Sequence, residues 1–117
     1  MKRLFALAAV FALSAVGASA APVGERHLTA HEPTAALRDA QHRTDVRITV
    51  WYPAAAGVKE ERIDLGPPGK PLFRVDQVAQ GAPFADMKRR PVILFSHGFG
   101  GTARMMGWFG VPLARAG

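Results

Sequence analysis

The sequence contains no cysteine, and after its first 20 residues it has no internal repeat and no low-complexity tract. Without cysteine, the chain has neither disulfide bonds nor the residue that a lipid-anchored exported protein carries at its cleavage point. Its stability must therefore come from a packed core or from sequence outside these 117 residues. The N-terminal apolar run, Leu4 to Val16, has 13 residues, whereas a membrane-spanning helix needs roughly 20. These absences argue against a disulfide scaffold, a repeat array and a membrane anchor.

The first 20 residues have the three zones of a secretory signal peptide. Lys2 and Arg3 form a basic start, the apolar run follows, and the small residues Gly17 to Ala20 end the segment. We therefore expect residues 1–20 to be removed by cleavage between Ala20 and Ala21. The mature chain, residues 21–117, is then secreted or periplasmic and has no stable membrane anchor.

The charge of the chain does not indicate a nucleic-acid partner. The formal net charge is +6, and the loss of Lys2 and Arg3 with the signal peptide lowers it to +4. The basic residues are scattered except for Lys88-Arg89-Arg90, directly before an apolar run. No aromatic residues alternate with these three, so they are more typical of a solvated strand entrance than of a nucleic-acid-binding patch.

Two β-strands and a long connection are expected in the first part of the mature chain. Residues Val46 to Tyr52 alternate and are rich in β-branched side chains, which predicts a half-buried strand that Pro53 ends. A weaker alternation over Glu25 to His31 predicts its hairpin partner. Between Ala54 and Arg90 the chain is rich in glycine and proline. A connection of this length either frames a ligand site or contains a short hairpin, built from the apolar islands at 63–65 and 72–75.

The last part of the sequence predicts a parallel strand and its crossover helix. Residues Pro91 to Phe95 form a continuous apolar run, typical of a central strand covered on both faces. Thr102 is then expected to cap a helix over 103–116, which Pro112 kinks or divides and Gly117 closes. The face of this helix toward the core is expected to carry Met105, Trp108, Phe109, Leu113 and Ala116. A parallel strand also needs a returning neighbour, so the domain over 21–117 is expected to be incomplete.

Chemistry is indicated by the glycine-dense turn between that strand and helix, Phe95-Ser96-His97-Gly98-Phe99-Gly100-Gly101-Thr102. Glycines allow a sharp turn in which backbone N–H groups point toward a ligand. The segment resembles the oxyanion loop of α/β-hydrolases. That resemblance implies that the backbone N–H of Phe99 is an oxyanion donor, with His97, Gly98, Gly100 and Gly101 forming the supporting turn.

The resemblance extends over most of the mature chain. The segments Val50 to Ala54, Pro83 to Ala85 and Val92 to Gly98 are similar to secreted bacterial hydrolases grouped with dienelactone hydrolases and platelet-activating-factor acetylhydrolase. Gly100 stands where many epoxide hydrolases and dehalogenases have proline, which argues against those activities. The fold class implied is α/β: the N-terminal portion of an α/β-hydrolase, with antiparallel first strands followed by a parallel strand and a crossover helix.

The function implied by this resemblance is hydrolysis of a small-molecule carboxylic ester or lactone without a metal or organic cofactor. The nucleophile, Ser or Cys, the catalytic His and the triad acid would lie beyond residue 117. These 117 residues alone are therefore expected to be inactive. Two alternatives remain: a non-catalytic binding protein of the same fold, and a small secreted interaction module that is complete at Gly117 and unfolds cooperatively. The oligomeric state is left open.

Several other polar and aromatic residues have structural interpretations. Ser96 is not within a Gly-x-Ser-x-Gly motif, and His97 precedes any such motif, so His97 is expected to hold the turn. No metal-ligand spacing is found for the remaining histidines, His27, His31 and His42. Positions in turns or on the surface are expected for Asp64, Asp76 and Asp86, and positions in the core for Trp51, Trp108 and Phe109.

Overall fold

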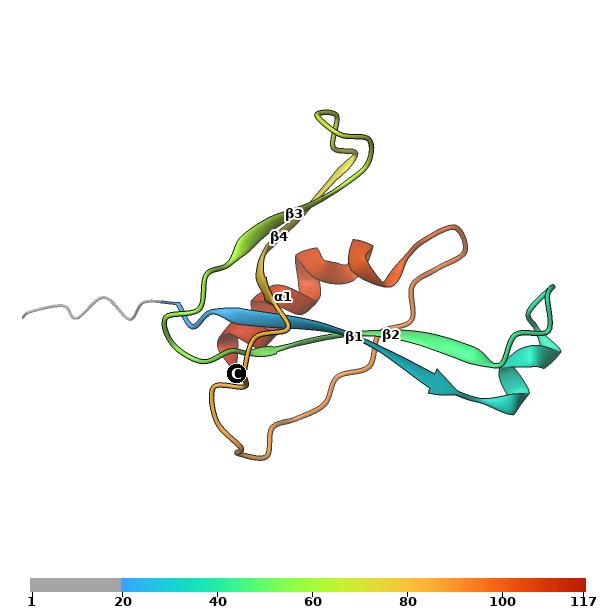
Figure 1. The fold of residues 1–117 in the computed structure, drawn as a ribbon, viewed down its shortest axis with the longest axis horizontal. Helices are drawn as coiled ribbons and strands as arrows, with labels where there is room; N and C mark the ends of the chain where they lie inside the picture. Colours follow the sequence, from blue (N-terminus) through green and yellow to red (C-terminus); the bar gives the residue numbers. More distant parts are fainter. Residues whose placement is uncertain (1–19) are drawn as a thin grey trace, which may run out of the picture.

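A computed structural model describes residues 20–117 and shows a mixed four-stranded sheet with one C-terminal helix (Figure 1). The predicted signal peptide lies almost entirely outside these residues. The strand order is β2-β1-β4-β3. The elements are β1 (Val23–His31), the 3₁₀ helix η1 (Pro33–Leu37), β2 (Asp45–Pro53), β3 (Glu61–Leu65), β4 (Phe73–Gln80), the 3₁₀ helix η2 (Ala103–Met106) and α1 (Gly107–Ala116).

The two strands expected first in the mature chain form an antiparallel ribbon. β1 and β2 pair without interruption from Val23 opposite Pro53 to His31 opposite Asp45. This confirms the strand predicted over Val46 to Tyr52 and the weaker hairpin partner before it. At the far end of the ribbon, Glu32 caps η1 by accepting a hydrogen bond from the Thr34 N–H at 3.0 Å. The sequence pattern had not indicated this short helix.

The long connection from Ala54 to Arg90 contains a hairpin, one of its two expected structures. β3 and β4 pair antiparallel around the turn at 66–69, where Gly66 and Gly69 have φ values of 136° and 73°. A non-glycine residue is strained at such positive φ angles, so the two glycines permit the reversal. β4 then runs parallel to β1 at Gly24 and Glu25, which joins the two hairpins into one sheet.

The C-terminal helix begins later, and faces the sheet differently, than the sequence predicted. Residues 103–106 form η2, and Thr102 makes no side-chain capping bond. α1 then continues through Pro112, and the division falls at Gly107 rather than at the proline. Its buried residues are Gly107, Gly110, Val111 and Ala114, whereas Trp108 is 64% exposed. The expected aromatic face is therefore wrong.

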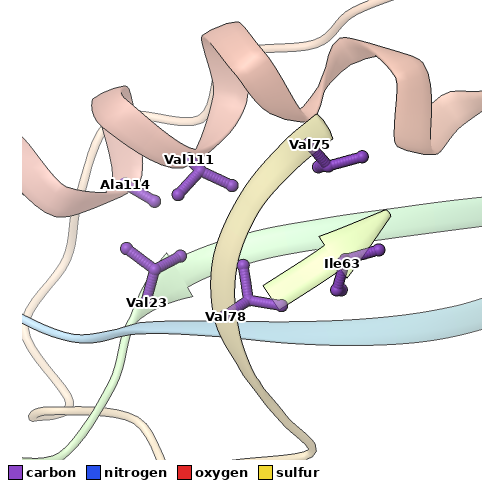
Figure 2. Close-up of a cluster of buried hydrophobic side chains, with 6 residues drawn as sticks. All are labelled: Val23, Ile63, Val75, Val78, Val111 and Ala114. Carbon is purple, nitrogen blue, oxygen red and sulfur yellow. The ribbon is translucent and has the colours of Figure 1, made fainter. Parts of the chain in front are cut away.

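Close packing explains why the face of α1 that carries Gly107 and Gly110 contacts the sheet. Gly107 lies directly against Val75 of β4, and Gly110 lies directly against the Trp51 ring of β2. A side chain at either position would collide with the sheet. The core cluster of Val23, Ile63, Val75, Val78, Val111 and Ala114 joins α1 to three of the strands (Figure 2). Trp51 packs against this cluster, as predicted, but Trp108 and Phe109 do not belong to it.

The predicted central strand over Pro91 to Phe95 is absent from the structure of residues 20–117. These residues have no regular secondary structure, and Val92 and Leu94 are 83% and 89% exposed. In Figure 1 they belong to the long connection that passes below the ribbon. A strand buried on both faces requires paired neighbours and covering layers. No described segment provides them, so the apolar run alone does not form a strand.

Candidate functional site

The glycine-dense turn lies between the unpaired apolar segment and η2. The Gly101 N–H donates to the Gly98 carbonyl at 3.1 Å, and Gly100 has a φ of 77°. The His97 Nδ1 atom lies 3.0 Å from the same carbonyl. The turn is therefore closed around one acceptor, the Gly98 carbonyl. This is the local geometry of the four residues expected to support the oxyanion donor.

The proposed donor residue, Phe99, projects fully into solvent. Within residues 20–117, no hydrogen bond uses its backbone N–H. A shallow hollow of about 300 Å³ lies beside the turn, at the low end of the size range of small-molecule sites. Its wall outside the turn consists of Phe73 from β4, Met105 and Met106 from η2, and Trp108 from α1. Phe99, whose N–H has no partner among residues 20–117, thus borders an open and mostly apolar hollow.

A second polar centre lies beneath η2, around the completely buried side chain of Glu25. Its carboxylate accepts hydrogen bonds from Trp51 Nε1 at 2.8 Å and Gln80 Nε2 at 2.9 Å. Arg104 donates to the same carboxylate through Nε at 2.9 Å and Nη2 at 2.7 Å. His27 Nε2 lies 2.8 Å from Glu25 Oε1. One carboxylate therefore connects β1, β2, β4 and η2.

The contacts of Glu25 determine its ionisation. Burial alone would raise the pKa of this carboxyl group, because the charged form loses its hydration. The hydrogen bonds from Gln80, Arg104 and Trp51, with the positive charge of Arg104, outweigh that effect and lower the pKa below its usual value. Glu25 is therefore a carboxylate at neutral pH. It has the donors that a buried charge requires.

The other polar residues considered in the sequence lie apart from the turn. Asp86 pairs with Arg90 at 3.0 Å, and Asp76 lies 3.9 Å from Arg115. Asp64 and His42 are exposed, and His31 lies 3.5 Å from Asp45 at the end of the ribbon. Among residues 20–117, no group of three or more potential metal ligands is brought together. None of the helices in this part of the chain is both long and apolar enough to cross a membrane.

Sequence reasoning did not identify Glu25 and Arg104. The antiparallel register places Glu25 opposite Trp51, so an acid on the Trp51 face of the ribbon was a detectable signal. Arg104, however, is 79 residues away from Glu25, and no local pattern marks it. Comparisons with protein-family models, curated proteins and solved structures give no match to this chain. The chemistry of the two sites must therefore be inferred from their own residues.

Proposed function

We propose that this chain contributes the oxyanion loop of an exported α/β-hydrolase that cleaves a carboxylic ester or a lactone. The observation that carries the proposal is the free Phe99 N–H in a glycine-dense turn directly before a helix. In α/β-hydrolases, a backbone N–H in such a turn supplies half of the oxyanion hole, and the residue after the nucleophile supplies the other half.

The apolar hollow beside the turn supports an acyl or lactone substrate. Met105, Met106 and Trp108 offer hydrocarbon and aromatic surface next to Phe99. A substrate carbonyl directed toward the Phe99 N–H would leave its apolar part against these side chains. Burial of that part contributes binding energy, while the polar turn is kept for the group whose charge changes during the reaction.

The proposed mechanism is covalent acyl transfer. A Ser or Cys nucleophile from outside residues 1–117 attacks the carbonyl carbon, and a histidine takes the nucleophile's proton. The carbonyl π electrons move to the oxygen, and the Phe99 N–H donates a hydrogen bond to the resulting oxyanion. The oxyanion then re-forms the carbonyl while the C–O bond to the alcohol breaks, and the histidine gives its proton to the departing alcohol oxygen. Water attacks the acyl-enzyme by the same route, which breaks its bond to the nucleophile and releases the acid. One such donor typically lowers the barrier by about 3–4 kcal/mol.

Two substitutions at Phe99 separate the backbone donor from the ring. Phe99→Ala retains the N–H and removes the aromatic surface, so it should change substrate preference or KM more than kcat. Phe99→Pro also removes the N–H. We expect its kcat to be reduced by about 100-fold or more relative to that of Phe99→Ala. The measurement is steady-state hydrolysis of short acyl esters by the exported protein.

Circular dichroism of both variants is the control, because proline also restricts the conformation of Gly98. Equal kcat values in two folded variants would show that the oxyanion is bound elsewhere. Labelling of the exported protein by a serine- or cysteine-directed acylating or phosphonate probe tests for the nucleophile independently. An exported protein with neither labelling nor hydrolysis would contradict the proposal.

A second candidate, an interaction module, is favoured by the exposed apolar segment. Val92 and Leu94 expose apolar side chains on a stretch of unpaired backbone, which is suited to the addition of a partner strand. This function requires no nucleophile. Binding of a partner by a protein that neither reacts with the probe nor hydrolyses esters would favour it over the hydrolase.

A further inference from the structure

The buried carboxylate of Glu25 has no role in the proposed acyl transfer, although it lies under the element that follows the glycine-dense turn. Among residues 20–117, it is the charged side chain that is completely buried. Burial of a charge is costly, and this one is compensated by donors from three separate elements. Such an arrangement fixes those elements relative to one another.

The turn itself has little to hold its position. On its N-terminal side, the segment Pro91 to Phe95 is unpaired and largely exposed. Inside the turn, the backbone hydrogen bond is that from Gly101 to Gly98. The several glycines increase the conformational freedom that must be restricted. The position of the turn therefore depends mainly on its C-terminal side.

On that side, η2 is attached to the sheet at two points, through the Arg104 side chain and through Gly107, which begins α1 and lies directly against Val75. Its own backbone bonds are short-range: Met105 N–H donates to Thr102, and Gly107 N–H donates to Arg104. The Arg104 guanidinium reaches Glu25 with two N–H groups, which fixes the direction of the side chain as well as its distance. Arg104 is one-third exposed while Glu25 is fully buried, so solvent screens this pair only in part.

We propose that Glu25 and Arg104 are positioning residues for the oxyanion loop. Trp51 and Gln80 hold the carboxylate from β2 and β4, the carboxylate holds Arg104, and Arg104 holds η2. This anchor sets where the turn, its Phe99 N–H and the Met105 and Met106 side chains lie relative to the sheet. The catalytic consequence rests on the proposed function, whereas the anchoring of the turn does not.

The chain offers a matched control for the Arg104 ion pair. Arg115 pairs with Glu60 at 3.0 Å, and both side chains are mostly buried, but this pair connects the end of α1 to the chain before β3. Arg115→Met should lower global stability without selectively releasing the turn. Arg104→Met removes the anchor, and Arg104→Lys retains the charge but loses the planar fork.

Amide hydrogen exchange in the exported protein tests the anchoring directly. The reporting amides are those of Gly101, Met105 and Gly107, and the amides of β4 serve as the reference for global stability. We expect Arg104→Met to accelerate the reporting amides about tenfold or more relative to the reference, and Arg104→Lys to have an intermediate effect. Arg115→Met should change this ratio by less than about twofold. Equal acceleration of both sets in Arg104→Met, or no acceleration, would overturn the anchor.

Hydrolysis by the same variants tests the catalytic consequence. In folded Arg104→Met, kcat should fall about tenfold or more while KM changes less, since a displaced donor is lost mainly from the transition state. Arg104→Lys should recover part of the loss, and Arg115→Met should retain kcat. An unchanged kcat in Arg104→Met would overturn the positioning role. An inactive wild-type protein would instead contradict the hydrolase proposal, and hydrogen exchange would still decide the anchor.

Discussion

The sheet with its helix and the connection from Asp86 to Thr102 behave oppositely, although both contain valine, leucine and phenylalanine. In the sheet and helix, Val23, Val78 and Val111 are completely buried. In the connection, Val92 and Leu94 are almost completely exposed. The difference is the presence of neighbours, because apolar surface stabilises a fold only where another surface removes it from water. Hydrophobicity of a segment therefore does not by itself determine whether the segment is buried.

The ionic contacts near the two ends of this connection also differ in their burial: those of Asp86 are partly exposed, and those of Glu25, which include Arg104, end on a fully buried carboxylate. Asp86 accepts a hydrogen bond from the Lys88 N–H and pairs with Arg90, and these contacts lower the pKa of its carboxyl group. The side chains of Asp86, Lys88 and Arg90 are all partly or largely solvated, so the ion pairs of Asp86 contribute little to stability. The Glu25 cluster, by contrast, excludes water from its carboxylate. An arginine–carboxylate pair therefore holds elements together at Glu25 but contributes little to stability at Asp86.

The largest expected effect distinguishes these two kinds of carboxylate. Glu25→Gln removes the negative charge that pairs with Arg104 and directs an NH₂ group either toward the donor of Trp51 or toward those of Gln80 and Arg104. We expect the free energy of unfolding of the protein to fall by about 3 kcal/mol, measured by urea unfolding followed by circular dichroism. Glu61→Gln is the control, since Glu61 pairs with Lys59 on the surface, and it should cost less than about 0.5 kcal/mol. Similar losses in the two variants would refute the contrast.

A smaller effect is expected from truncating valine in each region. Val78→Ala removes two buried carbon atoms from the core and should lower the free energy of unfolding by about 2 kcal/mol. Val92→Ala removes the same atoms from an exposed position and should cost less than about 0.5 kcal/mol. A loss at Val92 as large as that at Val78 would mean that this segment is covered in solution.

The smallest expected effect concerns acid. The pKa of Glu25 is lowered in the folded state, so the folded protein binds fewer protons there than the unfolded chain does. Its contribution to stability is complete above the ordinary carboxyl pKa of 4.5 and is lost as the pH falls below that value. Below about pH 5, stability should therefore fall more steeply in wild-type protein than in Glu25→Gln. Parallel pH profiles of the two proteins would show that Glu25 does not cause the loss of stability in acid. The loss would then come from carboxyl groups that both proteins contain, such as Glu32 and Asp86.

Local sequence patterns were sufficient for the hairpins. Alternation over Val46 to Tyr52 identified β2, and the two apolar islands flanking Gly66 to Gly69 suggested a hairpin, β3 and β4, as one of two alternatives. In each case the information lies within a few residues, because strand faces alternate and glycine permits the reversal. The closing glycine of α1 was also predictable, and Gly117 has a φ of 102°.

Features that depend on distant residues were missed or predicted wrongly. The helix face was assigned from the bulkiest apolar residues, but Gly107 and Gly110 face the sheet because Val75 and Trp51 leave no space for side chains. The run from Pro91 to Phe95 has the composition of a central strand, but no segment among residues 20–117 pairs with it. The glycine turn was recognisable as a motif, whereas its attachment through Arg104 depends on three-dimensional proximity to Glu25.

The contacts of Arg115 impose an order of events on a chain that is exported as we propose. Its guanidinium donates to the Ala21 carbonyl, 94 residues away, and to Glu60, which also accepts the Val23 N–H. A contact that closes such a long loop cannot form until the last turn of α1 has emerged. On the proposed export route, Ala21 would therefore lack this contact until α1 had followed it across the membrane. Docking of the start of the described chain against Arg115 would then be one of the last steps of folding.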